Sequence, residues 1–224
     1  MTRAVFFDVD FTLIYPGPSL QGEGHRVFCE RHGVHVDADR FSGAVKEASS
    51  LLHSGDQLYD PQIFIDYTSR IIELMGGSGP GVDLVSREIY QEWAVCHHFS
   101  LYDDVAATLR RLHADGKRIG LISNTHRCLT SFQSHFELEG LISATVSSSG
   151  HGYMKPHPSI FQAALTLAGV TAEESVMVGD SYAHDIAGAQ SLGMRGILIA
   201  RGSERPEAPG CAVVGSLHEI FEHL

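Results

Sequence analysis

The hydrophobic pattern divides the chain into two kinds of sequence. From about residue 100 onward, short apolar runs alternate with segments whose apolar residues recur every three or four positions. The runs predict strands and the segments predict helices, and their alternation is typical of βαβ units. The expected strands are 118–122, 144–146, 175–178 and 195–199, and the expected helices are 105–112, 159–167, 186–192 and 217–223. We therefore expect an α/β fold with a Rossmann-like parallel sheet and helices on both faces.

Residues 17–96 follow a different pattern, because no convincing strand signal occurs there. Four successive segments place apolar residues on one helical face. Their apolar positions are Val27 and Phe28 in the first segment, Phe41, Val45, Ala48 and Leu52 in the second, Phe64, Tyr67, Ile71 and Leu74 in the third, and Val85, Ile89 and Trp93 in the fourth. Breaks fall at Gly55 and 76–81. We expect an all-helical domain over 17–96, inserted into an α/β domain formed by 1–16 and 97–224.

The first apolar run of the chain ends in a pair of carboxylates. Residues 4–7 are followed by Asp8 and Asp10, with one residue between them, and then by Thr12. In open parallel sheets, ligands bind in the crevice beyond the carboxyl ends of the strands. The sequence therefore places Asp8 and Asp10 at the edge of the sheet where a site is expected.

Three later motifs lie where predicted strands end or predicted helices begin. They are Ser123-Asn124, Lys155-Pro156, and Gly179-Asp180-Ser181 followed by Asp185. Each motif alone is also typical of a turn or a helix cap. In a parallel sheet, however, all three can converge with Asp8 and Asp10 on one edge, so the prediction rests on their combination.

The carboxylates of such a cluster would repel one another, and their pKa values would rise if nothing neutralised them. A divalent cation resolves this conflict, and oxygen ligands of this kind suit Mg²⁺. A metal, a lysine and small hydroxyl or amide donors together form a clamp for phosphoryl oxygens. A carboxylate inside that clamp can attack phosphorus.

The four motifs together resemble those of the haloacid dehalogenase (HAD) superfamily. Residues 8–12 are similar to its motif I, D-x-D-x-T, and the three later motifs are similar to motifs II, III and IV in the order that the superfamily has them. The resemblance covers essentially the whole chain and implies a C1-type helical cap at 17–96. One position departs from the pattern, because Phe11 stands where the superfamily usually has glycine. A large side chain there is expected to narrow the site or to contact the substrate.

The resemblance also implies a role for each matching residue. Asp8 would be the catalytic nucleophile that forms an aspartyl-phosphate, and Asp10 would be the catalytic acid and base. The other implied roles are catalysis by Lys155, substrate binding by Thr12, Ser123, Asn124 and Lys155, Mg²⁺ binding by Asp8, Asp180 and the backbone carbonyl of Asp10, and support by Ser181 and Asp185.

Composition limits the partners and the compartment. Among the 224 residues, 27 are acidic and 16 are basic, which gives a net charge of −11. This balance argues against a nucleic acid or an anionic membrane as the main partner, because both require a basic surface. The four cysteines form no C-x-x-C pair, no apolar run approaches the length of a membrane span, and no secretory leader is recognisable. We therefore expect a cytoplasmic protein.

The expected function is Mg²⁺-dependent hydrolysis of a small phosphorylated metabolite by a monomer or homodimer. A sugar phosphomutase or a haloacid dehalogenase-type hydrolase is an alternative, although the second carboxylate, Asp10, favours phosphoryl transfer. An alternative from another class is a non-catalytic HAD-fold module that binds a phospholigand or a protein. The presence of Asp8, Asp10 and Lys155 counts against that third reading.

Overall fold

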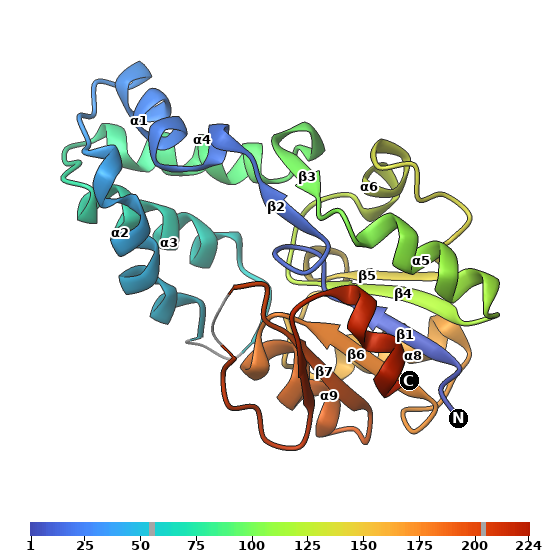
Figure 1. Ribbon diagram of the computed structural model, residues 1–224. Helices are drawn as coiled ribbons and strands as arrows, with labels where there is room; N and C mark the ends of the chain where they lie inside the picture. Colours follow the sequence, from blue (N-terminus) through green and yellow to red (C-terminus); the bar gives the residue numbers. More distant parts are fainter. Residues whose placement is uncertain (54–56, 203–204) are drawn as a thin grey trace. The chain divides into compact units, whose positions relative to one another are not determined.

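The computed structural model divides the chain into two compact units, which are residues 1–15 with 101–224 and residues 16–100. It describes residues 1–53, 57–202 and 205–224 (Figure 1). The break expected at Gly55 lies outside the described residues. The expected domain boundaries, and the interpretation of the helical unit as a C1-type cap, stay predictions.

The first unit is built on a six-stranded parallel sheet, which confirms the expected α/β fold (Figure 1). The strands lie in the order β5-β4-β1-β6-β7-β8. Their bounds are β1 Ala4–Phe7, β4 Arg118–Ser123, β5 Ala144–Ser147, β6 Ser175–Gly179, β7 Arg195–Ile199 and β8 Ala212–Val214. Every residue of β1 is buried. This explains its unbroken apolar sequence, because a central parallel strand is covered on both faces.

The helices of this unit cover both faces of the sheet (Figure 1). They are α5 Val105–Ala114, α6 Leu129–His135, α7 Ser148–His151, α8 Pro158–Ala168 and α9 Ala187–Gln190. Ala4 and Phe6 of β1 pack in one core cluster with Ile160 and Phe161 of α8. Side chains alternate along a strand, so the intervening residues of β1 face the opposite side of the sheet.

Two expected helices take a different form in the structure. The segment 217–223 is a 3₁₀ helix, Leu217–His223. The segment expected over 186–192 begins earlier with a π-helical turn, Tyr182–Ile186, and continues as α9. Apolar spacing does not separate these helix types, because all of them bury residues three to five positions apart.

The second unit contains four α-helices among its described residues. They are α1 Gly22–Arg31, α2 Phe41–Ala48, α3 Pro61–Leu74 and α4 Gly81–Trp93, joined in part by the 3₁₀ turns Pro18–Leu20, Ala38–Arg40, Ser49–His53 and Cys96–His98. The third helix starts where the sequence dictates, because the Asp60 side chain accepts a hydrogen bond from the Gln62 N–H and Pro61 occupies the first turn. The expected second helix ends at Ala48 and continues as a 3₁₀ turn.

A two-stranded sheet lies where the chain leaves the first unit and where it returns to it. The sequence did not predict this sheet. It consists of β2 Ile14–Pro16 and β3 Phe99–Leu101. Each has only three residues, too few to show the apolar and polar alternation of a half-buried strand. No helix among the described residues is long and apolar enough to cross a membrane.

Candidate active site

The candidate site lies at the carboxyl ends of three adjacent strands. Asp8 follows β1, Ser123 ends β4, and Asp180 follows β6. The parallel register pairs Phe7 with Leu121 on one side and with Val178 on the other, so the three ends meet at one edge. The Asp8 N–H donates a hydrogen bond to the Val178 carbonyl at 2.9 Å, which extends the ladder to the carboxylate itself.

Lys155 is the cation at the centre of this edge. Its Nζ lies 2.6 Å from Asp8 Oδ1 and 2.6 Å from Asp185 Oδ1. The exposed fractions of the three side chains are 2% for Lys155, 10% for Asp8 and 2% for Asp185. Burial lowers the pKa of Lys155, but the charges of Asp185 and Asp8 outweigh it and leave the pKa above its usual value. The ammonium group is therefore charged across the physiological pH range and fixes the Asp8 carboxylate.

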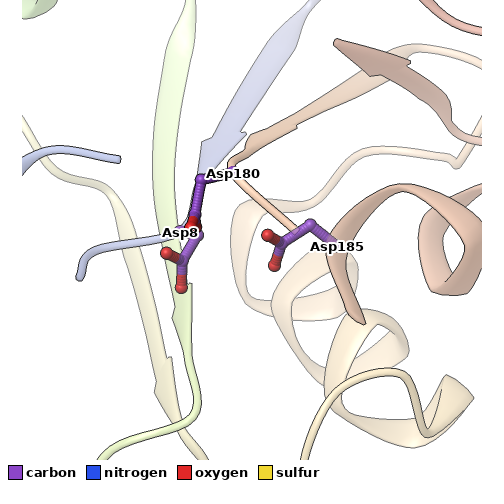
Figure 2. Close-up of side chains that lie close together, drawn as sticks. All are labelled: Asp8, Asp180 and Asp185. Atoms are coloured by element: carbon purple, nitrogen blue, oxygen red, sulfur yellow. The ribbon is translucent and has the colours of Figure 1, made fainter. Parts of the chain in front are cut away.

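Asp8, Asp180 and Asp185 form a cluster of carboxylates (Figure 2). One oxygen from each lies within 4.8 Å of the others. Burial raises the pKa of Asp185 to about 6, with Lys155 opposing the shift and Asp8 adding to it. The pKa of Asp180 is also raised, by lost hydration first and then by the charges of Asp8 and Asp185. Because Asp180 itself is exposed, water screens part of that effect.

The local backbone explains how Asp185 reaches the cluster. The Ser181 N–H donates a hydrogen bond to Asp185 Oδ2 at 3.0 Å, and the Ser181 hydroxyl caps the π-helical turn at the His184 N–H. Gly179 makes room for this arrangement, since a Cβ at that position would overlap the Asp185 carboxyl group. The glycine of the fourth motif is thus required by close packing against the carboxylate.

The second motif positions Lys155 through the side chain of Asn124. The Asn124 Oδ1 accepts a hydrogen bond from the Lys155 N–H at 2.7 Å, and its Nδ2 donates to the Lys155 carbonyl at 3.0 Å. Ser123 is buried beside it. The contact of either residue with a phosphoryl oxygen stays a prediction.

Thr12 connects the first motif to the fourth. Its hydroxyl donates to Asp180 Oδ1 at 3.3 Å. Its carbonyl accepts hydrogen bonds from Arg201, whose guanidinium also pairs with both carboxylate oxygens of Asp104. Thr12 is therefore held from two sides, although its predicted contact with substrate stays a prediction.

Asp10 has a cationic partner of its own, which the sequence interpretation missed. Arg127 donates from Nη1 to both Asp10 oxygens, at 3.0 and 3.1 Å. The pKa of Asp10 is raised because burial outweighs the opposing charge of Arg127, and Asp8 adds to the rise. The only sequence signal for Arg127 was its place four residues after Ser123, in the loop that follows a site strand.

Phe11 has an unusual backbone conformation for a bulky residue. Its φ is 64°, in the left-handed region, and its side chain is 45% exposed. An L-residue is strained there, whereas glycine is not. The chain therefore keeps a partly exposed aromatic ring beside Asp10 at a cost in backbone energy.

The residues present fit a divalent cation. With Lys155 charged, the cluster of Asp8, Asp180 and Asp185 carries an excess of negative charge, while Asp10 is balanced by Arg127. A site made of carboxylate oxygens suits a hard cation such as Mg²⁺. The resemblance implied that Asp8, Asp180 and the carbonyl of Asp10 bind the metal. In the structure, the carboxylate of Asp185 lies close to those of Asp8 and Asp180.

Comparisons with known proteins agree with this architecture. The family model described as haloacid dehalogenase-like hydrolase matches residues 2–193. "Haloacid dehalogenase-like hydrolase domain-containing protein 3" of Danio rerio is 30% identical over 209 residues, which cover 89% of this chain and 85% of that protein. "Ribulose-1,5-bisphosphate 5-phosphatase" of Halopiger xanaduensis is 30% identical over 210 residues, which cover 89% and 85%.

Solved structures extend the likeness to the complete fold. The HAD-hydrolase YfnB of Bacillus subtilis, bound to magnesium, matches with a TM-score of 0.80 over 100% of this chain and 98% of that one, at 17% identity. An identity this low supports the fold alone. The family match over residues 2–193 goes further, and with it the chain belongs to the haloacid dehalogenase-like hydrolases.

Proposed function

We propose that this hydrolase is a Mg²⁺-dependent phosphatase that acts on a small phosphorylated metabolite, with Asp8 as the nucleophile. The observation that carries the proposal is the Asp8 carboxylate at the end of a buried strand, held 2.6 Å from the Lys155 ammonium group. A carboxylate so fixed needs no reorientation before it attacks, which is the advantage that preorganised sites provide.

Asp10 supports phosphoryl transfer rather than dehalogenation. A phosphoester releases an oxygen that must take up a proton, and Asp10 stands two residues from the nucleophile. In the proposed reaction, Asp8 attacks phosphorus, the bond to the leaving oxygen breaks, and Asp10 gives that oxygen its proton. Asp10 then accepts a proton from the water that hydrolyses the aspartyl-phosphate. Burial raises the pKa of Asp10, and this shift acts in the direction that the first step needs.

Mg²⁺ would be held by Asp8 and Asp180, with Asp185 and the Asp10 carbonyl as further candidates. When bound, the ion supplies positive charge that offsets the phosphoryl oxygens and the crowded carboxylates. Lys155 adds a second, permanent positive charge, and Ser123, Asn124 and Thr12 are proposed to hold the remaining phosphoryl oxygens. The relative in Halopiger xanaduensis that is named for a phosphatase supports the same reaction class.

The test is phosphate release from a panel of phosphomonoesters, measured with Mg²⁺ and with EDTA. We expect Asp8→Asn to abolish the metal-dependent release. The matched control is Asp103→Asn, which changes an exposed aspartate of the same unit and should leave the rate unchanged. Release that survives Asp8→Asn would exclude Asp8 as the nucleophile. Absence of release from every ester, with Mg²⁺ still bound, would refute the phosphatase assignment.

A further inference from the structure

Arg127 is a fully buried cation whose guanidinium reaches the side of the site where Asp10 lies. We propose that Arg127 is a positioning residue, which holds the Asp10 carboxylate in the orientation for proton transfer to the leaving group. This inference rests on the proposed phosphatase function. The motifs of the sequence do not include Arg127, and the four site motifs are complete without it.

The burial of the pair gives the direction of the interaction. The Arg127 side chain is 0% exposed, whereas Asp10 is 16% exposed. Arg127 thus approaches Asp10 from the protein interior, and Asp10 keeps the open side. A ligand that enters from solvent can therefore reach Asp10, whereas the Arg127 side chain is covered by protein.

The contact restrains both oxygens of Asp10. Nη1 of Arg127 lies 3.0 Å from Oδ1 and 3.1 Å from Oδ2. Rotation of the carboxylate about its terminal torsion would lengthen one of these bonds. Charge-assisted hydrogen bonds are about twice as strong as neutral ones, so the guanidinium limits that rotation effectively.

The loop that carries Arg127 is itself fixed on the same edge of the sheet. The Arg127 N–H donates to the Thr125 hydroxyl at 3.0 Å. The Thr125 carbonyl accepts from the Ser149 N–H and from the Ser148 hydroxyl, at 3.2 and 3.4 Å. One residue before Thr125, Asn124 holds the backbone of Lys155. One loop therefore positions both Lys155 and the partner of Asp10.

This arrangement predicts a defect that depends on the leaving group. An alkyl phosphate needs a proton on its departing oxygen, whereas p-nitrophenyl phosphate releases a stable anion and needs little acid assistance. Loss of Asp10 orientation should therefore slow the first substrate far more than the second. A packing role alone would slow both substrates equally.

The experiment measures kcat and KM of wild type and Arg127→Met on an alkyl phosphate and on p-nitrophenyl phosphate. We expect kcat to fall by on the order of 10- to 100-fold for the alkyl ester and by less than about threefold for the aryl ester, with KM nearly unchanged. Arg110→Met, at an exposed position of α5, is the matched control. Equal losses on both esters, or no loss, would overturn the inference.

Two further variants keep the inference testable if Arg127→Met does not fold. Arg127→Lys retains the positive charge but not the guanidinium group that contacts both Asp10 oxygens. It should show the same selective loss of activity on the alkyl ester to a smaller degree. An equal effect on both esters would refute the positioning role. In an Asp10→Asn background, Arg127→Lys should cause no further loss of alkyl ester hydrolysis. An additional loss there would show that Arg127 acts by another route.

The controls separate this inference from the function on which it rests. Wild-type release that Asp8→Asn abolishes establishes the phosphatase, and an unselective effect of Arg127 substitution then overturns the positioning role alone. Failure of wild type to release phosphate from any ester of the panel, with Mg²⁺ still bound, overturns both.

Discussion

Replacement of Lys155 by methionine should test whether the charge of this side chain or its packing stabilises the cluster of Asp8 and Asp185. Methionine has a similar length and fills most of the space of the lysine side chain. It removes the ammonium group that lies 2.6 Å from both Asp8 and Asp185. Two nearly buried carboxylates are then left to face each other without a cation.

The magnitude follows from the geometry. Carboxylate oxygens of Asp8 and Asp185 lie within 4.8 Å of each other. At an effective dielectric constant of about 20, two charges at that distance repel by about 3.5 kcal/mol. Breaking a buried ion pair from one side typically costs about 3–5 kcal/mol, which is the same range. We therefore expect the free energy of unfolding of the metal-free protein to fall by about 3–5 kcal/mol at pH 8.

The assay is urea denaturation of wild type and Lys155→Met between pH 8 and pH 5. The pKa of Asp185 is about 6 with Lys155 present, and it should rise when the cation is lost. Protonation at pH 5 then removes the repulsion, so the difference between the two proteins should shrink as the pH falls. Lys46→Met, at an exposed position, is the control and should change stability by less than about 0.5 kcal/mol. A loss of the same size at pH 5 and pH 8 would refute the electrostatic explanation.

Four further predictions follow from the same site. Gly179→Ala should displace the Asp185 carboxylate and reduce both stability and metal-dependent activity, as measured by thermal unfolding and phosphate release; unchanged values would mean that the backbone yields easily. The pKa of Asp185 is about 6 rather than 3.8, so its ionisation lowers the free energy of unfolding of the metal-free protein on the order of 3 kcal/mol at pH 8. This destabilisation should disappear as the pH falls through 6 toward 4. Asp185→Asn should flatten that part of the stability profile, and a profile identical to wild type would contradict the assignment. Phe11→Gly should relieve left-handed strain and change stability by no more than about 1 kcal/mol, in the stabilising direction, whereas Phe11→Ala should not stabilise; calorimetry distinguishes them. Mg²⁺ at 100 times its dissociation constant should stabilise the protein by about 2.7 kcal/mol, and Asp180→Asn should weaken this effect in a thermal-shift titration; an undiminished shift would place the ion elsewhere.

The sequence predicted the parts of the site that strand ends determine. Asp8 and Asp180 follow buried apolar runs, and the rule that parallel strands end at one edge was enough to bring them together. Asp185 and Lys155 required the order of the motifs as well, because neither lies at a strand end. Their mutual contact depends on how two loops fold back on the sheet. The spacing of residues along the sequence does not predict these loop conformations.

The burial of Arg127 and the contacts of the Asn124 side chain are the features of the site that could not be predicted from the sequence. An arginine in a polar loop is typical of a solvated surface, and only the packing around it reveals that it is buried. Asn124 is proposed to contact a phosphoryl oxygen, and the sequence did not predict that its side chain is hydrogen-bonded to the Lys155 backbone. An amide can serve many partners, so its identity alone does not select one. The three-residue strands β2, β3 and β8 were not predicted.

The central position of β1 also has a consequence for the order in which the chain folds during its synthesis. Ala4 pairs with Arg118 on one side and with Ser175 on the other, so the strand that precedes Asp8 has no sheet neighbour until more than a hundred further residues have been made. The unit of residues 16–100 is continuous in sequence and can close its own helical contacts first, because local contacts form fastest. During synthesis on the ribosome, the apolar segment Ala4–Phe7 therefore stays exposed to solvent while the helical unit of residues 16–100 folds. We expect this interval to be the period in which the nascent protein depends most on chaperones.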